Sequence, residues 1–448
     1  MTDRATALTR TLIDTLRGRL PAEDPWLDAV EEVARDVLTV EKASAEFTAA
    51  RVFERLAEPD RIIAFRVTWR DDAGQVQINR GWRVQQSNLL GPYKGGLRWH
   101  PDTTLPILKS LAFEQVFKNA LTGLPLGGAK GGSDFDPKGR SAAELERFAL
   151  AFMGELGAHI GPDRDVPAGD MGVSAREIGL LARAYTLQAR AWGGALTGKP
   201  LCIGGSPLRV EATGYGLVFF LCAMLSAQGQ EIAGQRIALS GRGTVALHAA
   251  RKATDLGGRV IALSARAGTW HAPEGMSAEA LDWLSGTRGD AALDPPRGLG
   301  LTFRAGQKPW GFEPDIALPC ATQNELDADD ARALIDGGCR VLAEGANMPL
   351  TPDATVALAR AGVVVAPGKA ANAGGVAVSA LEMRQNAGFA RWTAARVEEE
   401  LREIMAALHD RVAEEGRSGS AGPIDYRRGA NIAAYRRLAQ AVIEGGAV

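Results

Sequence analysis

The sequence predicts an α/β protein with two domains, and three observations support this prediction. The chain has 448 residues with 46% hydrophobic content, enough to bury a large core and more than one domain usually needs. Residues 1–200 combine apolar positions at helical spacing with short alternating runs that are typical of strands. From about residue 201, short apolar runs that suit buried parallel strands alternate with helical segments, which predicts a doubly wound sheet.

Composition and charge narrow the class of protein further. A net charge of −2 gives no reason to expect nucleic acid or an anionic membrane as a partner. The N-terminus lacks the basic and apolar segments of a signal peptide, and the longest strongly apolar stretch, Leu217 to Leu225, is too short to span a bilayer. We therefore expect a soluble cytoplasmic protein that binds neither nucleic acid nor membranes.

The cysteines indicate neither a disulfide framework nor a metal site. They are scattered, with no CxxC pair and no histidine cluster beside them: Cys202, Cys222, Cys320 and Cys339. We expect buried free thiols in a reducing compartment and no bound metal.

The first 200 residues are expected to form helices around a few strands. Alternating runs at 62–69 and 75–85 flank the turn signal Asp71-Asp72-Ala73-Gly74 and predict a hairpin. The segments with apolar residues at helical spacing are 1–57, 101–121 and 141–160.

Two lysines framed by glycines stand out in this region. Lys130 lies within Gly127-Gly128-Ala129-Lys130-Gly131-Gly132, and Lys94 is bracketed by glycines in the same way between Gly91 and Gly96. So many glycines cost backbone entropy, and close approach of a ligand to the backbone explains them. We interpret both segments as loops that line a pocket for an anion. The alternative is a flexible surface loop with an ordinary solvated lysine.

Polar residues near these segments extend the candidate pocket. Gln115 and Lys118 are three residues apart on a predicted helix and share a face, so together they could hold a carboxylate instead of meeting solvent. Asp170 ends an acidic loop of residues 161–170 and follows Gly169, which allows tight packing against a ligand. Most aspartates in such loops cap turns or meet solvent.

The second half of the chain carries a dinucleotide fingerprint. A short apolar strand at 236–240 runs directly into Gly241-Arg242-Gly243-Thr244-Val245-Ala246 and a helix. This is the G-x-G-x-x-A pattern in its credible context, where backbone N–H groups and the helix dipole receive a pyrophosphate. Further apolar runs that suit parallel strands follow at 259–263, 315–319, 340–343 and 363–366.

The end of the second strand indicates the coenzyme. An acidic residue there accepts the ribose 2′-OH of NAD, but this chain has Ser264-Ala265-Arg266. No carboxylate repels a 2′-phosphate, and Arg266 could pair with one, although it could equally be a surface charge. The sequence favours NADP(H) over NAD(H).

With these motifs in place, the chain resembles glutamate dehydrogenase, of the hexameric small-subunit type common in bacteria and fungi. The resemblance spans about residues 60 to 385. The matching stretches are 91–100, 113–119, 124–138, 165–177, 211–216, 316–326, 343–349 and 366–379.

The resemblance implies reversible reductive amination of 2-oxoglutarate with ammonium to L-glutamate. It implies that Lys130 and Asp170 are catalytic and exchange protons with the substrate, with Lys130 crowded by the positive charges of Lys94 and Lys118. The substrate-binding positions that it implies are Lys94 and Ser379 for the side-chain carboxylate, Gln115 and Lys118 for the α-carboxylate, and Gly169 for the α-amino group.

The fingerprint and the resemblance together give the expected coenzyme site. Its residues are Thr213, Gly241, Arg242, Gly243, Thr244, Ser264, Arg266 and Asn347. Three positions depart from the family pattern: Thr244 replaces the usual Asn, Arg242 replaces a small residue, and Ala129 replaces a glycine. We expect the charge of Arg242 to lie near the pyrophosphate and to favour it.

The expected domains follow from this assignment. Residues 1–200, completed by C-terminal helices at 376–448, form an α/β substrate-binding and oligomerisation domain with a mixed sheet, and residues 201–375 form a Rossmann-like domain. The family implies a homohexamer.

Three other functions remain as alternatives. A branched-chain or aromatic amino acid dehydrogenase has no use for a lysine in its side-chain pocket, so Lys94 and Ser379 argue against it. A catalytically silent metabolite sensor would be expected to lack Lys130 or Asp170, but both residues are present. A malic-enzyme-like decarboxylase needs a divalent metal, and no acidic cluster suggests one.

Overall fold

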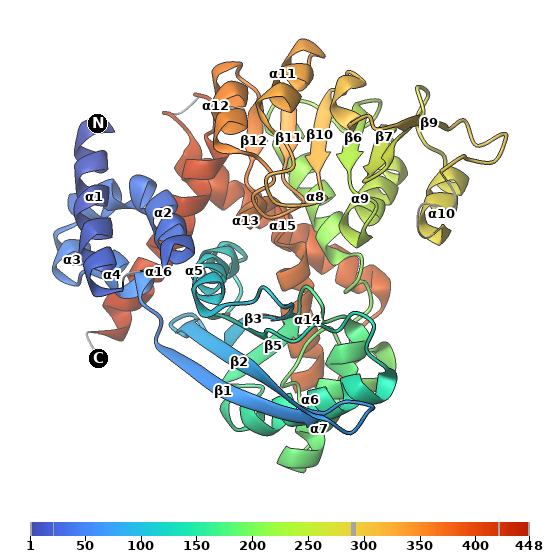
Figure 1. The fold of residues 1–448 in the computed structure, drawn as a ribbon. Helices are drawn as coiled ribbons and strands as arrows, with labels where there is room; N and C mark the ends of the chain where they lie inside the picture. Colours follow the sequence, from blue (N-terminus) through green and yellow to red (C-terminus); the bar gives the residue numbers. More distant parts are fainter. Residues whose placement is uncertain (1, 21, 288–292, 420–421, 447–448) are drawn as a thin grey trace. The chain divides into compact units, whose positions relative to one another are not determined.

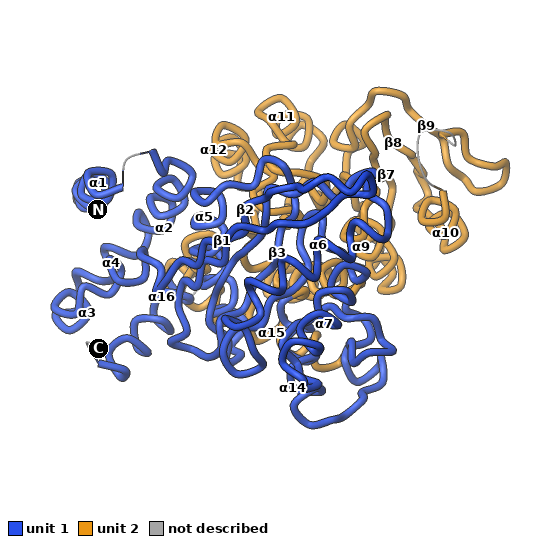
Figure 2. Tube along the Cα trace, turned by 60° about the horizontal axis from the view of Figure 1, so that its bottom comes forward, with its two compact units in different colours: residues 1–209, 376–397, 431–448 blue, residues 210–375, 398–430 orange. Residues whose placement is uncertain are grey.

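The fold was analysed in a computed structural model that describes residues 2–20, 22–287, 293–419 and 422–446. The chain divides into two compact units, coloured blue and orange in Figure 2. Unit 1 comprises Met1–Arg209, Val376–Val397 and Asn431–Val448. Unit 2 comprises Val210–Gly375 and Glu398–Ala430.

The C-terminal region is shared between the two units, which differs from the domain boundary that the sequence predicted. The sequence assigned all of 376–448 to the first domain, but residues 398–430 pack in unit 2. Side-chain contacts within that unit explain the difference. Glu398 accepts a hydrogen bond from Lys252 at 2.8 Å, and His409 and Tyr426 contact the ring of Phe220.

Within the described residues, unit 1 holds a five-stranded mixed sheet in the order β1-β2-β4-β3-β5. Its strands are β1 (Arg61–Arg70), β2 (Val76–Ser87), β3 (Tyr93–Trp99), β4 (Gly128–Ser133) and β5 (Asp165–Gly169). β1, β2 and β4 pair antiparallel, whereas β3 pairs parallel with both β4 and β5. The predicted hairpin and the predicted mixed sheet are confirmed.

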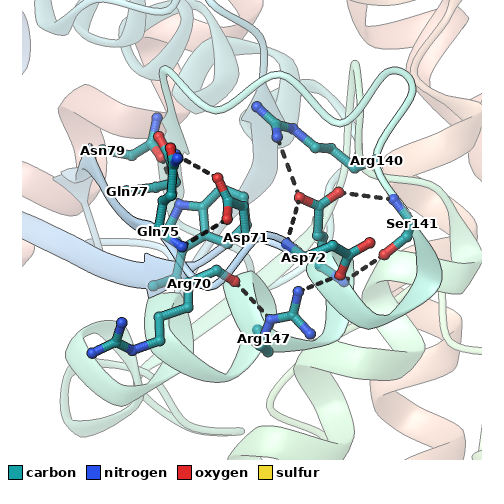
Figure 3. Close-up of polar contacts among 11 residues, drawn as sticks. Arg70, Asp71, Asp72, Gln75, Gln77, Asn79, Arg140, Ser141 and Arg147 are labelled. Carbon is teal, nitrogen blue, oxygen red and sulfur yellow. Dashed lines mark hydrogen bonds and ion pairs between the residues drawn. The ribbon is translucent and has the colours of Figure 1, made fainter.

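The hairpin turn between β1 and β2 is held by polar contacts at its tip (Figure 3). Asp71 accepts hydrogen bonds from the backbone N–H of Gln75 at 2.9 Å and from the side chain of Gln77 at 2.8 Å. Asp72 pairs with Arg147 at 2.6 Å. The Gln75 N–H, more than any other group, lowers the pKa of Asp71. The turn predicted from Asp71-Asp72-Ala73-Gly74 is therefore present and is tied to the following helical layer.

The lysine-bearing segments are strands, not the loops that the sequence predicted. Lys94 lies in β3 and Lys130 in β4, and the expected acidic loop contains β5. Their glycines are required by close backbone approach rather than by turns. A Cβ at Gly132 would lie 2.1 Å from the carbonyl oxygen of Arg98, and one at Gly95 would lie 1.6 Å from that of Ala129. A strand made of glycines has no alternation of side chains, so period-based reasoning does not recognise it.

Helices cover both faces of this sheet (Figure 1). One face packs aromatic residues against α6 (Ala142–Leu156) and α7 (Ala175–Ala189), with Phe135 and Phe148 stacked at 3.7 Å. The other face packs Trp82 and Val84 against α5 (Leu105–Leu121). The helices that begin in unit 1 are α1 (Thr2–Arg19), α2 (Asp24–Ala43), α3 (Ala45–Ala49), α4 (Val52–Ala57), α5 (Leu105–Leu121), α6 (Ala142–Leu156), α7 (Ala175–Ala189) and α15 (Ala394–Gly416).

In the part of the chain that the structure describes, unit 2 holds a seven-stranded sheet in the order β12-β11-β10-β6-β7-β8-β9. Its strands are β6 (Arg236–Ser240), β7 (Arg259–Ala265), β8 (Gly268–His271), β9 (Thr302–Ala305), β10 (Ile316–Pro319), β11 (Val341–Ala343) and β12 (Val364–Ala366). The five strands from β12 to β7 are parallel, and β8 and β9 add an antiparallel edge that the sequence did not predict.

The order of these strands confirms the predicted doubly wound topology. From β6 the chain moves to β7 on one side, then crosses to β10, β11 and β12 on the other. This reversal beside β6 is the switch point at which such sheets bind ligands. The helices that begin in unit 2 are α8 (Ala212–Ser226), α9 (Thr244–Asp255), α10 (Ala278–Gly286), α11 (Ala328–Asp336), α12 (Pro352–Arg360), α13 (Gly368–Ala371), α14 (Gly374–Ala387) and α16 (Tyr426–Gly445).

Among the described residues, no helix is both long enough and apolar enough to cross a membrane. No group of three or more His, Cys, Asp or Glu side chains in the same residues is placed to hold a metal ion.

Candidate active site

The side chains of Lys130 and Asp170 meet across a glycine of β3, the strand that lies between theirs. Lys130 lies on β4 and Asp170 follows β5, and β3 runs between these strands. The Lys130 Nζ lies 3.0 Å from an Asp170 carboxylate oxygen. A Cβ at Gly96 would lie 2.8 Å from the Asp170 Cβ and 3.3 Å from the Lys130 Nζ. Glycine at position 96 therefore leaves the space in which this ion pair forms.

Arg98 provides a second positive charge for the same carboxylate. Its Nε donates to Asp170 at 3.1 Å. Burial alone would raise the pKa of Asp170, but the charges of Lys130 and Arg98 outweigh burial and lower this pKa overall. The Asp170 carboxylate is thus held ionised between two cations.

Lys94 is a buried cation on the same face of β3 as Gly96, because residues two apart on a strand share a face. Its exposed fraction is 1%. Burial places the pKa of Lys94 well below 10.5, and the neighbouring charges of Arg209 and Arg83 lower it further, while Glu382 opposes them. A buried ammonium with positive neighbours is poised to receive an anion.

Arg209 connects this region to Ser379 on α14. Its Nε donates to the Ser379 Oγ at 3.0 Å, and burial lowers the pKa of Arg209 while Glu382 opposes that shift. Glu382 is itself fully buried and pairs with Lys199 at 2.7 Å. The carboxylate of Glu382 therefore partly balances several buried cations of unit 1.

The remaining predicted substrate residues lie on α5 and at the end of β5. Gln115 donates to Asn119 at 2.7 Å, and Asn119 donates in turn to the carbonyl oxygen of Lys94 at 3.1 Å. Lys118 is half-buried and lies one turn beyond Gln115 on the same helix. Gly169 ends β5, where a Cβ would lie 2.5 Å from a backbone oxygen.

The glycine fingerprint of unit 2 lies at the switch point of its sheet. Gly241 has a φ of 86°, which favours glycine, and a Cβ there would lie 3.1 Å from the Cα of Ala321. Gly243 is the N-cap of α9, and as a glycine it has no side chain that could cap this helix. Thr244 begins α9 and is exposed. The N–H groups at this helix start are thus available to a phosphate group, so the residues present fit a dinucleotide.

The other predicted coenzyme residues lie on unit 2 at different depths. Ser264 is buried in β7, whereas Arg266 is exposed in the turn that follows. Thr213 is half-buried in the first turn of α8. Asn347 follows β11, and its side-chain oxygen accepts a hydrogen bond from Asn372 at 3.0 Å. The ends of β6, β7 and β11 point to one edge of the sheet because these strands are parallel.

Several residues of this region escaped sequence analysis. Arg98 and Arg209 belong to no recognisable pattern of their own, and only the fold brings them to Asp170 and Ser379. Asp165, which the sequence placed in an acidic loop, is fully buried and accepts a hydrogen bond from the Arg83 Nε at 2.9 Å. No local signal distinguishes it from the solvated aspartates beside it.

The cysteine prediction needs one correction. All four thiols are free, and Cys320 and Cys339 are buried as expected, but Cys222 is only half-buried and Cys202 is exposed. It lies in a short 3₁₀ turn at Leu201–Ile203, which leaves its side chain at the surface.

Unit 2 has the doubly wound topology and glycine-rich helix start that are typical of dinucleotide-binding domains, and unit 1 contains buried cations of the kind that anion sites use. Both features are typical of a dinucleotide-dependent oxidoreductase that acts on an anionic substrate.

Comparison with known proteins identifies the family. Residues 204–446 match the family model described as Glutamate/Leucine/Phenylalanine/Valine dehydrogenase. Residues 59–187 match the model of the Glu/Leu/Phe/Val dehydrogenase dimerisation domain. The chain belongs to this family, and within it to the glutamate dehydrogenases.

Relatives and solved structures agree on this assignment. The chain is 48% identical to the NADP-specific glutamate dehydrogenase of Psychrobacter sp. (strain TAD1), covering 97% of this chain and 98% of the relative. It is 47% identical to the NAD-specific glutamate dehydrogenase of Bacteroides fragilis (strain YCH46), covering 98% and 99%. The crystal structure of Plasmodium falciparum glutamate dehydrogenase superposes with a TM-score of 0.94 at 42% identity, covering 99% of this chain and 95% of that one.

Proposed function

We propose that the protein is a glutamate dehydrogenase that catalyses the reversible reductive amination of 2-oxoglutarate with ammonium to L-glutamate, using NADPH. The observation that carries this proposal is the buried Lys94, with Arg209 and Ser379 in the same unit, beside the Lys130–Asp170 ion pair. A substrate with a carboxylate at the end of its side chain satisfies buried positive charge that an apolar side chain would leave uncompensated.

The pocket chemistry favours a dicarboxylate over the branched-chain or aromatic amino acids that other family members are named for. Lys94 and Ser379 receive the side-chain carboxylate, and Arg209 joins them because its guanidinium holds Ser379. Gln115 and Lys118 on α5 receive the α-carboxylate. The backbone at Gly169 accepts the amino group, since a side chain there would collide with the neighbouring loop.

Lys130 and Asp170 carry the proton transfers. The Lys130 ammonium polarises the C2 carbonyl of 2-oxoglutarate and donates a proton to the oxygen that leaves as water. Asp170, held ionised by Lys130 and Arg98, accepts protons from the incoming nitrogen and returns them in the reverse reaction. When bound, a nicotinamide coenzyme would supply the hydride that reduces C2.

The coenzyme is assigned from residues, because similar relatives are named for both coenzymes. The N-terminus of α9, with Gly241, Gly243 and Thr244, receives the pyrophosphate. Ser264 and Arg266 at the end of β7 place no carboxylate against a 2′-phosphate, which favours NADPH. Further contacts to the coenzyme come from Thr213 and Asn347.

We assign substrate binding and oligomerisation to unit 1 and coenzyme binding to unit 2, and we propose that a homohexamer forms in the cytoplasm. The exposed edge of β1 supports assembly, since an edge strand offers unpaired backbone groups to another copy. Apolar side chains on this hairpin are exposed, with Val76 at 53% and Ile78 at 68%. This hairpin lies in the segment that matches the dimerisation-domain model.

Initial rates with 2-oxoglutarate and ammonium, measured with NADPH and NADH at matched concentrations, test the proposal. We expect a strong preference for NADPH. Activity with NADH alone would keep the reaction and reject the coenzyme assignment. No rate with either coenzyme would favour the silent metabolite sensor, and faster turnover of an apolar 2-oxo acid would favour a branched-chain or aromatic enzyme.

A further inference from the structure

Arg242, between the two glycines of the fingerprint, contacts an aromatic side chain of a neighbouring part of the sheet. Its guanidinium carbon lies 5.2 Å from the centre of the Trp270 ring. Trp270 belongs to β8, the strand next to β7 on the side away from β6. The side chain of Arg242 thus reaches from the end of β6 across to the neighbourhood of β7 and β8.

Trp270 is a rigid partner for this guanidinium. It is fully buried, and its Nε1 donates to the carbonyl oxygen of Leu293 at 2.9 Å. Its ring contacts Phe303 with centroids 5.1 Å apart and Trp283 with centroids 6.3 Å apart. An arginine stacked on a fixed aromatic face loses little conformational freedom when it binds an anion.

The pairing of β7 and β8 places the ring beneath this guanidinium close to the carboxyl end of β7. Trp270 is opposite Leu263 on one face of the sheet, whereas the next pair, Thr269 and Ser264, faces the other side because successive residues of a strand alternate. Ser264 is near the carboxyl end of β7, where doubly wound sheets read the 2′ position of the adenosine ribose. Arg304 on β9 pairs with Thr269, so its side chain lies on the Ser264 face of the sheet.

From this geometry we propose that Arg242 binds the 2′-phosphate of NADPH, and that Trp270 positions it for this role. The glycines on either side of Arg242 leave the backbone to the pyrophosphate, while the side chain is directed to the ribose. Coenzyme selectivity then depends on Arg242 and its aromatic support together with Ser264, and less on the exposed Arg266. This inference rests on the proposed function only for the identity of the coenzyme.

Calorimetric binding of two fragments to the full-length protein tests the proposal without turnover. Adenosine 2′,5′-bisphosphate and adenosine 5′-monophosphate differ only in the 2′-phosphate. We expect Arg242→Ser to weaken the bisphosphate by about 10- to 100-fold, the usual worth of a charged hydrogen bond. The monophosphate should bind to Arg242→Ser as it binds to the wild type. Arg360→Ser removes an exposed arginine from the end of α12 and should change neither affinity.

The positioning role of Trp270 has its own test. Trp270→Leu should weaken the bisphosphate selectively, whereas Trp270→Phe should restore binding because it keeps an aromatic face for Arg242. If the leucine variant does not fold, the selectivity of Trp270→Phe compared with wild type and Arg242→Lys decides the point. A lysine keeps the charge but not the planar stacking, so it should recover only part of the affinity.

Two results would overturn the proposal. Equal weakening of both fragments in Arg242→Ser would place this residue at the 5′-phosphate or in a structural role. Unchanged binding in Arg242→Ser, with selective loss in Arg266→Ser, would assign the 2′-phosphate to Arg266. Neither result bears on whether the wild-type enzyme turns over 2-oxoglutarate, so failure of this inference is distinct from failure of the proposed function.

Discussion

At the scale of single residues, the candidate site depends on charges that are buried close to one another. Lys130 and Asp170 form an ion pair at 3.0 Å, and Arg98 donates to the same carboxylate at 3.1 Å. Lys94 is 1% exposed among further cations. Such an arrangement costs folding free energy unless an anion completes it, which is typical of a site that is organised for its ligand.

Replacing Lys130 tests its proposed catalytic role. Lys130→Ala should lower kcat by about 10³-fold, because it removes the group proposed to polarise the substrate carbonyl and to exchange its proton. Asp170 keeps Arg98 as a partner, so the fold should persist by circular dichroism. Lys138→Ala, a loss of an exposed lysine after β4, is the matched control and should retain wild-type rates. Near-normal turnover in Lys130→Ala would reject the catalytic assignment.

Lys94 should determine selectivity for a dicarboxylate. Lys94→Met keeps most of the side-chain volume but removes the charge, so kcat/KM for 2-oxoglutarate should fall by about 100-fold or more. The kcat/KM for 2-oxopentanoate, which lacks the second carboxylate, should fall much less. Both substrates are measured with the same saturating coenzyme. Equal losses for the two would count against a side-chain carboxylate at Lys94.

At the scale of elements, three adjacent strands form the site, and glycines allow them to do so. β4 brings Lys130, β3 brings Lys94 and Gly96, and β5 leads into Asp170. Lys130 and Asp170 meet over β3, so β3 needs a glycine at that point. Any Cβ at position 96 would enter the space that the Lys130–Asp170 ion pair occupies. These segments therefore behave as strands whose sequence is dictated by neighbours rather than by strand propensity.

A single methyl group on β3 should show this effect. Gly96→Ala should lower kcat/KM by about 100-fold, because it displaces the catalytic side chains. It should also destabilise the protein by about 1–3 kcal/mol through overpacking. Gly154→Ala in α6 is the control, since a Cβ there would meet no described atom within 4 Å. That variant should be as active as the wild type and slightly more stable. Wild-type activity in Gly96→Ala would mean that the Lys130–Asp170 ion pair does not need glycine at position 96.

At the scale of the whole molecule, the β1–β2 hairpin is the surface expected to join copies of the chain. β1 is an edge strand of ten residues, and the outer parts of β1 and β2 are exposed. Ile78→Asp should shift the assembly toward smaller species in size-exclusion chromatography with light scattering, because it buries a charge in an apolar contact. Val356→Asp changes a similarly exposed apolar residue of α12 in unit 2 and should leave the mass unchanged. A hexamer that persists in Ile78→Asp would exclude this hairpin as an essential interface.

Stability as a function of pH should report the buried Lys94. Its folded-state pKa lies well below the unfolded value of 10.5, so the unfolded chain binds more protons between the two values. The free energy of unfolding contributed by this group therefore rises with pH through that interval and is least favourable below it. Urea midpoints of the ligand-free wild type and Lys94→Met should differ most in favour of the variant at the low-pH end of this interval, and the two midpoints should converge as the pH approaches 10.5. A difference that does not depend on pH would mean that Lys94 keeps an ordinary pKa.

The sequence by itself determined the fold class, the doubly wound topology and the family. Its reliable signals were local: the run from a short apolar strand into Gly241-Arg242-Gly243, the alternating hairpin around Asp71, and the glycine-framed Lys94 and Lys130. Each of these depends on neighbours in the chain, so periodicity and turn chemistry can reveal it.

Only the tertiary structure decided how these pieces meet. The segments around Lys94 and Lys130, predicted as loops, are strands. Arg98 contacts Asp170, and Arg209 contacts Ser379. Residues 398–430 belong to unit 2. These features depend on backbones and charges far apart in sequence, and a close approach between two strands leaves no trace in either one except a glycine. The direction of the Arg242 side chain toward Trp270 is of the same kind, because its partner lies on a strand that the sequence did not predict.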